Sequence, residues 1–253
     1  MLFDTHAHYD SRQFHEDRAA VLSGLPARGI SLVVNPGCDI PSSRMAVELA
    51  EQYSFVYAAV GFHPEELDGA SLSDLDEIRR LAAHEKVVAI GEIGLDYHWD
   101  IEKEIQHRVF EDQLSIAEQY KMPVIIHDRE AHGPVFDAVK RHPDVIGVMH
   151  GYSGSAEMAR EYAKMGWYIA FGGPVTYKTA EKVREACRAV PTDRLLIETD
   201  CPYLPPVPHR GEINLSKNMI HTIKIMAETR GEDVESLAAA MIENTKRLFN
   251  IEF

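Results

Sequence analysis

Residues 87–92, Val-Val-Ala-Ile-Gly-Glu, form a short apolar run that ends in a side chain able to bind a metal ion. Four other runs share this pattern and end in His or Asp: residues 3–8, 123–127, 145–150 and 195–200. A run of four to eight apolar residues is typical of a buried strand. The pattern therefore predicts a metal-binding side chain at the carboxyl end of each of five strands.

Strands and helices alternate from one end of the chain to the other. Further strands are expected at residues 31–35, 55–60 and 167–171, and helices at about 15–28, 42–52, 102–120, 215–229 and 233–249. Ser42 and Ser43 are expected to cap the helix at 42–52. Eight strands that alternate with helices predict a parallel sheet, and eight such units most often close as a barrel.

We therefore predict a single metal-dependent hydrolase domain over residues 1–253, of the α/β class. Its fold is expected to be a (β/α)8 TIM barrel with a metal site at the C-terminal ends of the strands. An open doubly wound sheet is the alternative, but the chain has no Gly-rich phosphate turn after the first expected strand, which is the usual mark of that fold.

Composition limits the kinds of partner. The net charge is −14, with 40 acidic against 26 basic residues, and no basic patch of the kind that grips a long polyanion is visible. Two divalent cations would nevertheless reverse the local field at a site for a phosphate substrate. The N-terminus has no basic segment followed by an apolar run, and no apolar run approaches the ~20 residues of a membrane span. A cytoplasmic protein with no membrane partner and no obligate protein partner is expected.

Two imidazoles near the N-terminus have the spacing of a chelate. His6 and His8 are two residues apart, so on a strand both project to the same side. Taken alone, each candidate ligand also has an ordinary structural explanation, and it is their joint position at strand ends that favours a metal site. The six predicted ligands are His6, His8, Glu92, His127, His150 and Asp200.

Six ligands suit two divalent ions that share one carboxylate, an arrangement that serves hydrolysis. Imidazole favours zinc or another transition metal, whereas carboxylate oxygens also accept manganese or magnesium. The mixed set leaves the identity of the metal open.

Several longer motifs carry a resemblance to a known family. They are Asp-Thr-His-Ala-His (4–8), Gly-Phe-His-Pro (61–64), Gly-Glu-Ile-Gly-Leu-Asp-Tyr (91–97), Ile-His-Asp-Arg (126–129), His-Gly-Tyr-Ser-Gly (150–154) and Glu-Thr-Asp-Cys-Pro-Tyr-Leu (198–204). With these motifs the chain resembles TatD-type metal-dependent deoxyribonucleases, a branch of the amidohydrolase-like hydrolases, over essentially its whole length. The resemblance implies that one metal is held by His6, His8 and Asp200, the other by His127 and His150, and that Glu92 bridges them.

The chain departs from the family pattern at three places. Asp128 stands where a serine is common, Gly151-Tyr152 replace a cysteine-phenylalanine pair, and Asn214-Leu215-Ser216 replace Asn-Glu-Pro. None of these is a predicted ligand, but the last lies in the loop after the eighth expected strand, where substrate preference is set.

The expected function is a divalent-metal-dependent hydrolase that cleaves DNA phosphodiester bonds, with 3′-5′ exonuclease-like trimming of single strands or ends. Asp200, as general base, and Glu92, as metal bridge, are the predicted catalytic residues. His63 and Arg210 are the predicted substrate contacts, although His63 could instead cap the turn made by Pro64. One alternative is an ester, lactone or amide hydrolase of the same superfamily. A more distant alternative is a metal-binding regulatory protein without turnover.

Overall fold

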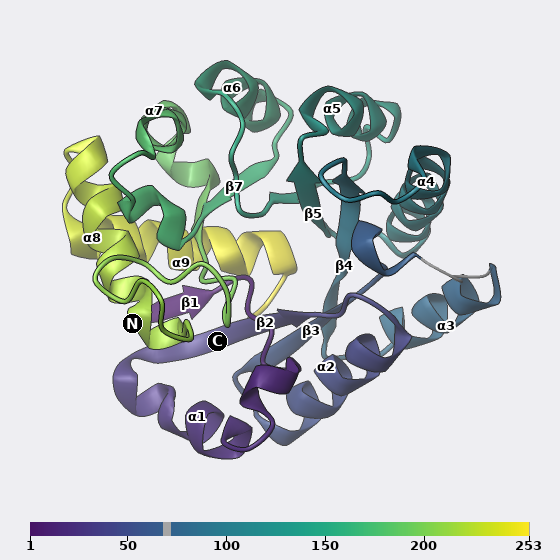
Figure 1. The fold of residues 1–253 in the computed structure, drawn as a ribbon, viewed down its shortest axis with the longest axis horizontal. Helices are drawn as coiled ribbons and strands as arrows, with labels where there is room; N and C mark the ends of the chain where they lie inside the picture. Colours follow the sequence, from purple (N-terminus) through teal and green to yellow (C-terminus); the bar gives the residue numbers. More distant parts are fainter. Residues whose placement is uncertain (68–71, 253) are drawn as a thin grey trace. The chain divides into compact units, whose positions relative to one another are not determined.

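The computed structural model describes residues 1–67 and 72–252, and its strands follow one another in chain order within one sheet (Figure 1). The pairs β1–β2, β3–β4, β4–β5, β5–β6 and β7–β8 are all parallel. The strands are β1 (Leu2–Asp4), β2 (Ile30–Pro36), β3 (Val56–Val60), β4 (Val87–Asp96), β5 (Val124–Arg129), β6 (Gly147–Met149), β7 (Tyr168–Phe171) and β8 (Leu195–Ile197).

A helix follows each strand, and two follow the last. The helices are α1 (Arg18–Gly24), α2 (Ile40–Gln52), α3 (Leu72–Ala82), α4 (Lys103–Tyr120), α5 (His132–Arg141), α6 (Ala156–Lys164), α7 (Glu181–Ala189), α8 (Met219–Arg230) and α9 (Val234–Phe249). This order of strands and helices confirms the predicted (β/α)8 fold. Among the described residues, no helix is both long enough and apolar enough to cross a membrane.

The chain divides into two compact units. The terminal unit consists of Met1–Val34 and His150–Phe253, and the central unit consists of Asn35–Met149. The terminal unit holds β1, β7 and β8 with most of β2, and the central unit holds β3 to β6. The assignment of residues 1–253 to a single domain stays a prediction.

Within the terminal unit, backbone hydrogen bonds join the segment after β1 to the segment after β8. The amide of Asp200 donates to the carbonyl of His6 over 2.9 Å, and the amide of His8 donates to the carbonyl of Cys201 over 2.7 Å. Ala7 and Cys201 form a parallel bridge between these hydrogen bonds. The strand expected over the run at residues 3–8 is therefore regular only to Asp4, and the rest of the run is hydrogen-bonded to the segment that follows the last strand.

Within the central unit, β4 is longer than the sequence predicted. It was expected to end at Glu92, but it continues to Asp96 and is buried along its whole length. Gly94 lies opposite His127 in β5 with φ +147°, and a Cβ at this position would lie 1.9 Å from the carbonyl oxygen of His127. Only glycine fits that close approach, so Gly94 allows the strand to continue and to bring Asp96 beside β5.

The expected cap of α2 was wrong by three residues. The helix begins at Ile40, and Asp39 caps it, because its side chain accepts a hydrogen bond from the amide of Ser42 over 2.8 Å. The hydroxyl of Ser42 accepts one in return from the amide of Asp39 over 2.9 Å, which completes a capping box. Pro41 lies in the first turn, where a missing N–H costs nothing. The helix expected at 15–28 is also shorter, as α1 shows.

Candidate metal centre

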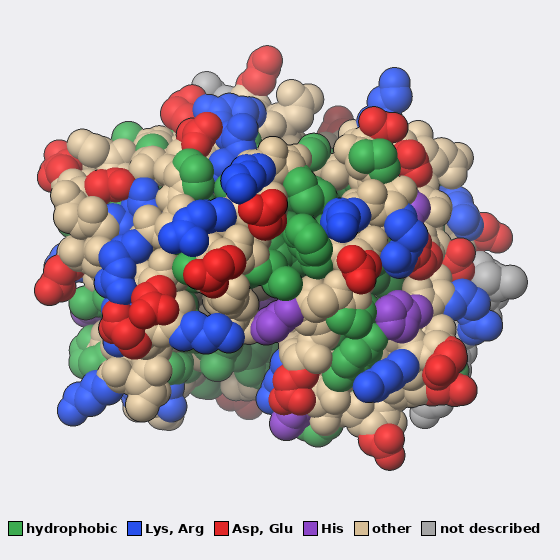
Figure 2. Space-filling view, turned by 90° about the horizontal axis from the view of Figure 1, so that it is seen from above, with side chains coloured by type: hydrophobic (Ala, Val, Ile, Leu, Met, Phe, Trp, Pro, Cys, Tyr) green, Lys and Arg blue, Asp and Glu red, His purple; other side chains and the backbone are tan. Residues whose placement is uncertain are grey.

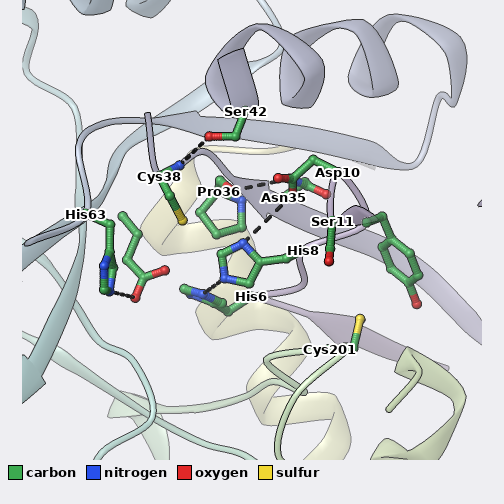
Figure 3. A network of polar contacts seen from close by, with 12 residues as sticks. His6, His8, Asp10, Ser11, Asn35, Pro36, Cys38, Ser42, His63 and Cys201 are labelled. Atoms are coloured by element: carbon green, nitrogen blue, oxygen red, sulfur yellow. Dashed lines mark hydrogen bonds and ion pairs between the residues drawn. The ribbon is translucent and has the colours of Figure 1, made fainter. Parts of the chain in front are cut away.

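Three predicted ligands meet within the terminal unit. The Nε2 atoms of His6 and His8 lie 3.0 Å apart, and a dashed line joins the two rings in Figure 3. One carboxylate oxygen of Asp200 lies 3.5 Å from Nε2 of His8 and 3.7 Å from Nε2 of His6. Zinc bonds of about 2.0–2.2 Å to nitrogen and oxygen would place neighbouring ligand atoms roughly 3–3.7 Å apart. The three side chains therefore fit the binding of one ion.

His150 and Glu198 extend this group. The ring of His150 stacks on that of His6 with centroids 3.9 Å apart, and its Nδ1 lies 3.4 Å from Oε1 of Glu198. Oε1 of Glu198 also accepts a hydrogen bond from the amide of Gly151 over 2.6 Å. Its other oxygen, Oε2, is buried and has no hydrogen-bond partner among the described residues. A buried carboxylate oxygen without a partner is costly, and a bound cation would supply one.

A buried carboxylate holds the backbone next to the ligands of the terminal unit. These ligands, called the terminal group, are His6, His8, His150, Glu198 and Asp200. Asp4 is fully buried, and it accepts hydrogen bonds from the amide of His6 (3.3 Å), the amide of Thr199 (3.0 Å) and the hydroxyl of Thr199 (2.6 Å). Burial raises the pKa of Asp4 to about 7, although its hydrogen bonds with Ser216, Thr199 and His6 act in the opposite direction. These hydrogen bonds fix the chain just before each of the ligands His6 and Asp200.

Ser216, at one of the departures from the family pattern, belongs to the same support. Its hydroxyl lies 2.7 Å from the hydroxyl of Tyr9, and its amide donates to that Tyr9 oxygen over 3.1 Å. A proline at position 216 would lack both the amide hydrogen and the hydroxyl. The departure thus adds polar contacts beneath the ligands rather than altering them.

The central unit brings together a second group around His127. Its Nδ1 lies 3.0 Å from Oε1 of Glu92, and its Nε2 lies 2.9 Å from Oδ2 of Asp96. His63 approaches the same Glu92 oxygen with its Nε2 at 3.4 Å, and its ring meets that of His127 edge to face with centroids 4.3 Å apart. Two imidazoles and two carboxylates therefore converge here.

Glu65 completes the central group. Glu65, Asp96 and His127 each offer a ligand atom, and these atoms lie within 4.8 Å of one another. Burial and the neighbouring charge of Asp96 raise the pKa of Glu65. Burial acts against the ionised form of Asp96 as well, but hydrogen bonds from His127 and from the amide of His98 hold its pKa below the usual value.

Sequence reasoning missed three members of these groups as possible ligands. Asp96, Glu65 and Glu198 were not among the six predicted ligands. Glu198 directly follows the last residue of β8, so the strand-end pattern that found Asp200 could have found it. Asp96 also ends a strand, but the strand was expected to stop at Glu92. Glu65 lies within the short turn at Pro64–Glu66, and no pattern in the sequence marks it.

The two predicted substrate contacts have different surroundings. His63 caps the turn at Pro64–Glu66, because its Nδ1 accepts a hydrogen bond from the amide of Glu65 over 3.1 Å. This confirms the structural role, while its Nε2 faces Glu92. Arg210 is exposed, and its guanidinium lies 4.0 Å above the ring of Tyr177.

Cys201 is not a nucleophile of this site. It is fully buried, and burial raises the pKa of its thiol far above the usual value. A thiol held in this protonated state is inert.

Comparisons with known proteins agree with this chemistry. Residues 3–250 match the family model described as TatD related DNase. The protein named uncharacterized metal-dependent hydrolase YabD, from Bacillus subtilis (strain 168), is 45% identical over 254 residues, which cover 99% of this chain and 100% of that protein. The 3′-5′ ssDNA/RNA exonuclease TatD of Citrobacter koseri is 34% identical over 263 residues and matches 100% of both chains.

The fold comparison gives the same result. The crystal structure of YjjV, a TatD homolog from Escherichia coli K12, matches with a TM-score of 0.94 and 34% identity, and covers 99% of this chain and 98% of that one. Sequence, fold and donor groups are consistent with one another, and the chain belongs to the TatD family of metal-dependent hydrolases.

Proposed function

We propose that this protein is a two-metal phosphodiesterase that trims single-stranded DNA from its 3′ end. The observation that carries the proposal is the presence of one group of imidazole and carboxylate donors in each unit, at or near the ends of parallel strands. The name of the Citrobacter koseri relative, a 3′-5′ ssDNA/RNA exonuclease, supports the choice of substrate.

Active sites of (β/α)8 barrels lie at the carboxyl ends of the strands, which supports metal ligands at these positions. In the proposed site, His6, His8 and Asp200 hold one ion, His127 and His150 hold the other, and Glu92 is shared. Bound zinc, manganese or magnesium would polarise a phosphoryl oxygen and lower the pKa of water.

The protein's own groups then have separate tasks. Asp200 is the proposed general base, because its side chain is 17% exposed beside two buried imidazoles and can accept a proton from an attacking water. Asp4 and Thr199 keep the backbone of Asp200 in place through the hydrogen bonds beneath it. His63 is the proposed donor to a substrate phosphate, and Arg210 is a second cation for the strand.

The charge distribution of the protein favours the binding of a strand end over the binding of a long duplex. On the face drawn in Figure 2, Lys and Arg side chains are interspersed with Asp and Glu. Few phosphates would then be neutralised by protein cations. For two such contacts on a single strand, affinity should fall only about sevenfold between 50 and 200 mM salt, against 10³ or more for a protein with many contacts.

The test compares a linear with a covalently closed single-stranded DNA circle of equal sequence, using metal-loaded protein over this range of salt. We expect rapid trimming of the linear strand, little cleavage of the circle and a shallow salt slope. Equal rates on both, or a steep slope, would contradict trimming from ends.

A second arm separates the proposal from other hydrolases of this fold. Single-stranded RNA, a p-nitrophenyl ester and a lactone are assayed beside the DNA strand. Faster turnover of the ester or the lactone than of either nucleic acid would replace the phosphodiesterase with an ester hydrolase. Metal binding without turnover of any of these substrates would favour a regulatory protein.

A further inference from the structure

The loop after β4 presents a large aromatic side chain to solvent. Trp99 is 49% exposed, whereas the other tryptophan of the chain, Trp167, is 1% exposed. Single exposed apolar side chains are common and mean little by themselves. Trp99 differs because its indole is anchored at a defined place.

Two contacts anchor the ring. Burial raises the pKa of Glu65, and a hydrogen bond from the side chain of Trp99, whose indole nitrogen can only donate, acts in the opposite direction. The imidazole of His98 meets the ring at 84°, with centroids 5.2 Å apart. An anchored ring has already lost much of its rotational freedom, so a ligand that packs on it has less entropy to overcome.

The anchor also ties the ring to the central donor group. Glu65 is itself a member of that group, with Asp96 and His127. Asp96 ends β4 only three residues before Trp99. A phosphate bound at these donors would therefore have an aromatic surface beside it.

Two cations lie in the same part of the central unit. Arg129 pairs with Asp96 in the register of β4 and β5, and Lys103 lies over the ring of Tyr97 at 4.1 Å. Both side chains are exposed. An aromatic ring together with cations is the combination by which proteins hold single strands, since the ring stacks on a base and the cations accompany the backbone.

We propose that Trp99 is a stacking platform for one unpaired nucleobase of the strand whose phosphate lies at the metal centre. The inference rests on the proposed function and deepens it, because it gives the site a means of selecting single strands. A base within a duplex is already stacked on both faces and cannot also stack on Trp99.

The first test uses tryptophan fluorescence. The metal-loaded protein is titrated with a phosphorothioate-linked oligothymidylate, which resists cleavage. Stacking should quench the emission of Trp99, and the buried Trp167 should contribute a constant background. The Trp99→Phe variant should show no quench while it retains affinity within a few-fold, because phenylalanine also stacks.

The second test measures affinity. Trp99→Leu keeps an apolar side chain but removes the aromatic face, and it should weaken oligothymidylate binding roughly 5- to 150-fold. Oligonucleotides with one abasic residue at successive positions locate the stacked base. At that position the original protein should bind as weakly as Trp99→Leu. Tyr120→Leu, which changes another exposed aromatic residue of the central unit, is the matched control and should bind normally.

The outcomes separate the inference from the proposed function. If the protein trims DNA but Trp99→Leu binds every strand as the original does, the platform is wrong and the function stands. If quenching and the abasic effect are seen without cleavage of any strand, the platform stands and the function is wrong. If neither quenching nor cleavage is observed, the stacking platform and the proposed function are both wrong.

Discussion

The donor groups of the two units differ in what surrounds their imidazoles. In the terminal unit His6 and His8 face one another at 3.0 Å, and His150 stacks on His6. In the central unit His127 has a carboxylate at each ring nitrogen, Glu92 at one and Asp96 at the other. The first group is therefore rich in nitrogen and the second rich in negative charge.

This difference has consequences for the metal. Two facing Nε2 atoms cannot both carry a proton at 3.0 Å without conflict, so at least one presents a lone pair that an ion could use. Imidazole-rich sites suit zinc and other transition metals, and oxygen-rich sites also accept magnesium or manganese. We expect the terminal group to select its ion more strictly than the central group does.

The largest effect is expected at Glu92, which the proposed site shares between both ions. Glu92→Gln should abolish nearly all turnover and lower the metal content, because a neutral amide bridges two cations poorly. Elemental analysis and a cleavage assay measure both quantities. Glu157→Gln, at a side chain that is 81% exposed, is the control. Unchanged occupancy with full activity would exclude a bridging role.

Asp200 tests the terminal group alone. Asp200→Asn should reduce turnover by roughly 10²–10⁴, the usual span for a lost general base, with some metal loss added. The rate is measured at saturating metal, with a circular-dichroism spectrum to confirm folding. Asp193→Asn changes a side chain that is 64% exposed and should behave as the original. A rate for Asp200→Asn within a few-fold of the original would remove it from the mechanism.

Asp96 tests the central group. Asp96→Asn removes the carboxylate that contacts Nε2 of His127, and the loss of such a partner typically costs 10- to 100-fold in metal affinity or activity. Competition with a chelator should show weaker binding of one ion while the other keeps its affinity. Asp76→Asn, at a side chain that is 78% exposed, is the matched substitution. Equal weakening of both ions would show that the two groups do not act separately.

The smallest effect concerns the support beneath the terminal group. Ser216→Ala removes the buried hydroxyl contact with Tyr9 and should cost about 0.5–1.5 kcal/mol in the free energy of unfolding. Denaturant titrations of Ser216→Ala, Tyr9→Phe and the double variant give the coupling between the two residues. Additive losses would mean that the two hydroxyls do not interact.

The fold was predictable because eight short apolar runs marked the strands, and helical stretches alternated with them. The predicted ends of helices and strands were less accurate where a hydrogen bond from a side chain or a close contact with another segment decides where the element ends. Asp39 caps α2 ahead of Pro41, and a local pattern of serines favoured Ser42 instead. Gly94 extends β4 because it fits beside the carbonyl of His127, a contact between segments that no local pattern contains.

The residues of the candidate site also differ in how well the sequence predicted them. His6, His8 and Asp200 were predicted to bind one ion and do lie together, since their positions at strand ends determine their neighbours. Glu65 and Trp99 lie in loops, and only the folded chain brings the indole against the carboxylate. Loop contacts depend on tertiary structure, so sequence patterns do not report them.

The hydrogen bond between Asp4 and Thr199 spans 195 residues of sequence, and it has a consequence for the timing of synthesis. The donors around His127 all lie between residues 63 and 127 and can gather when about half of the chain has been made, whereas His150, the other proposed ligand of that ion, follows later. The terminal group can form only after residue 200 has been synthesised and has contacted residues 6 and 8, and contacts of such long range form late. A nascent chain would therefore assemble its two donor groups in sequence. The oxygen-rich group can gather first, and the histidine-rich group completes the site only when the last strand is in place.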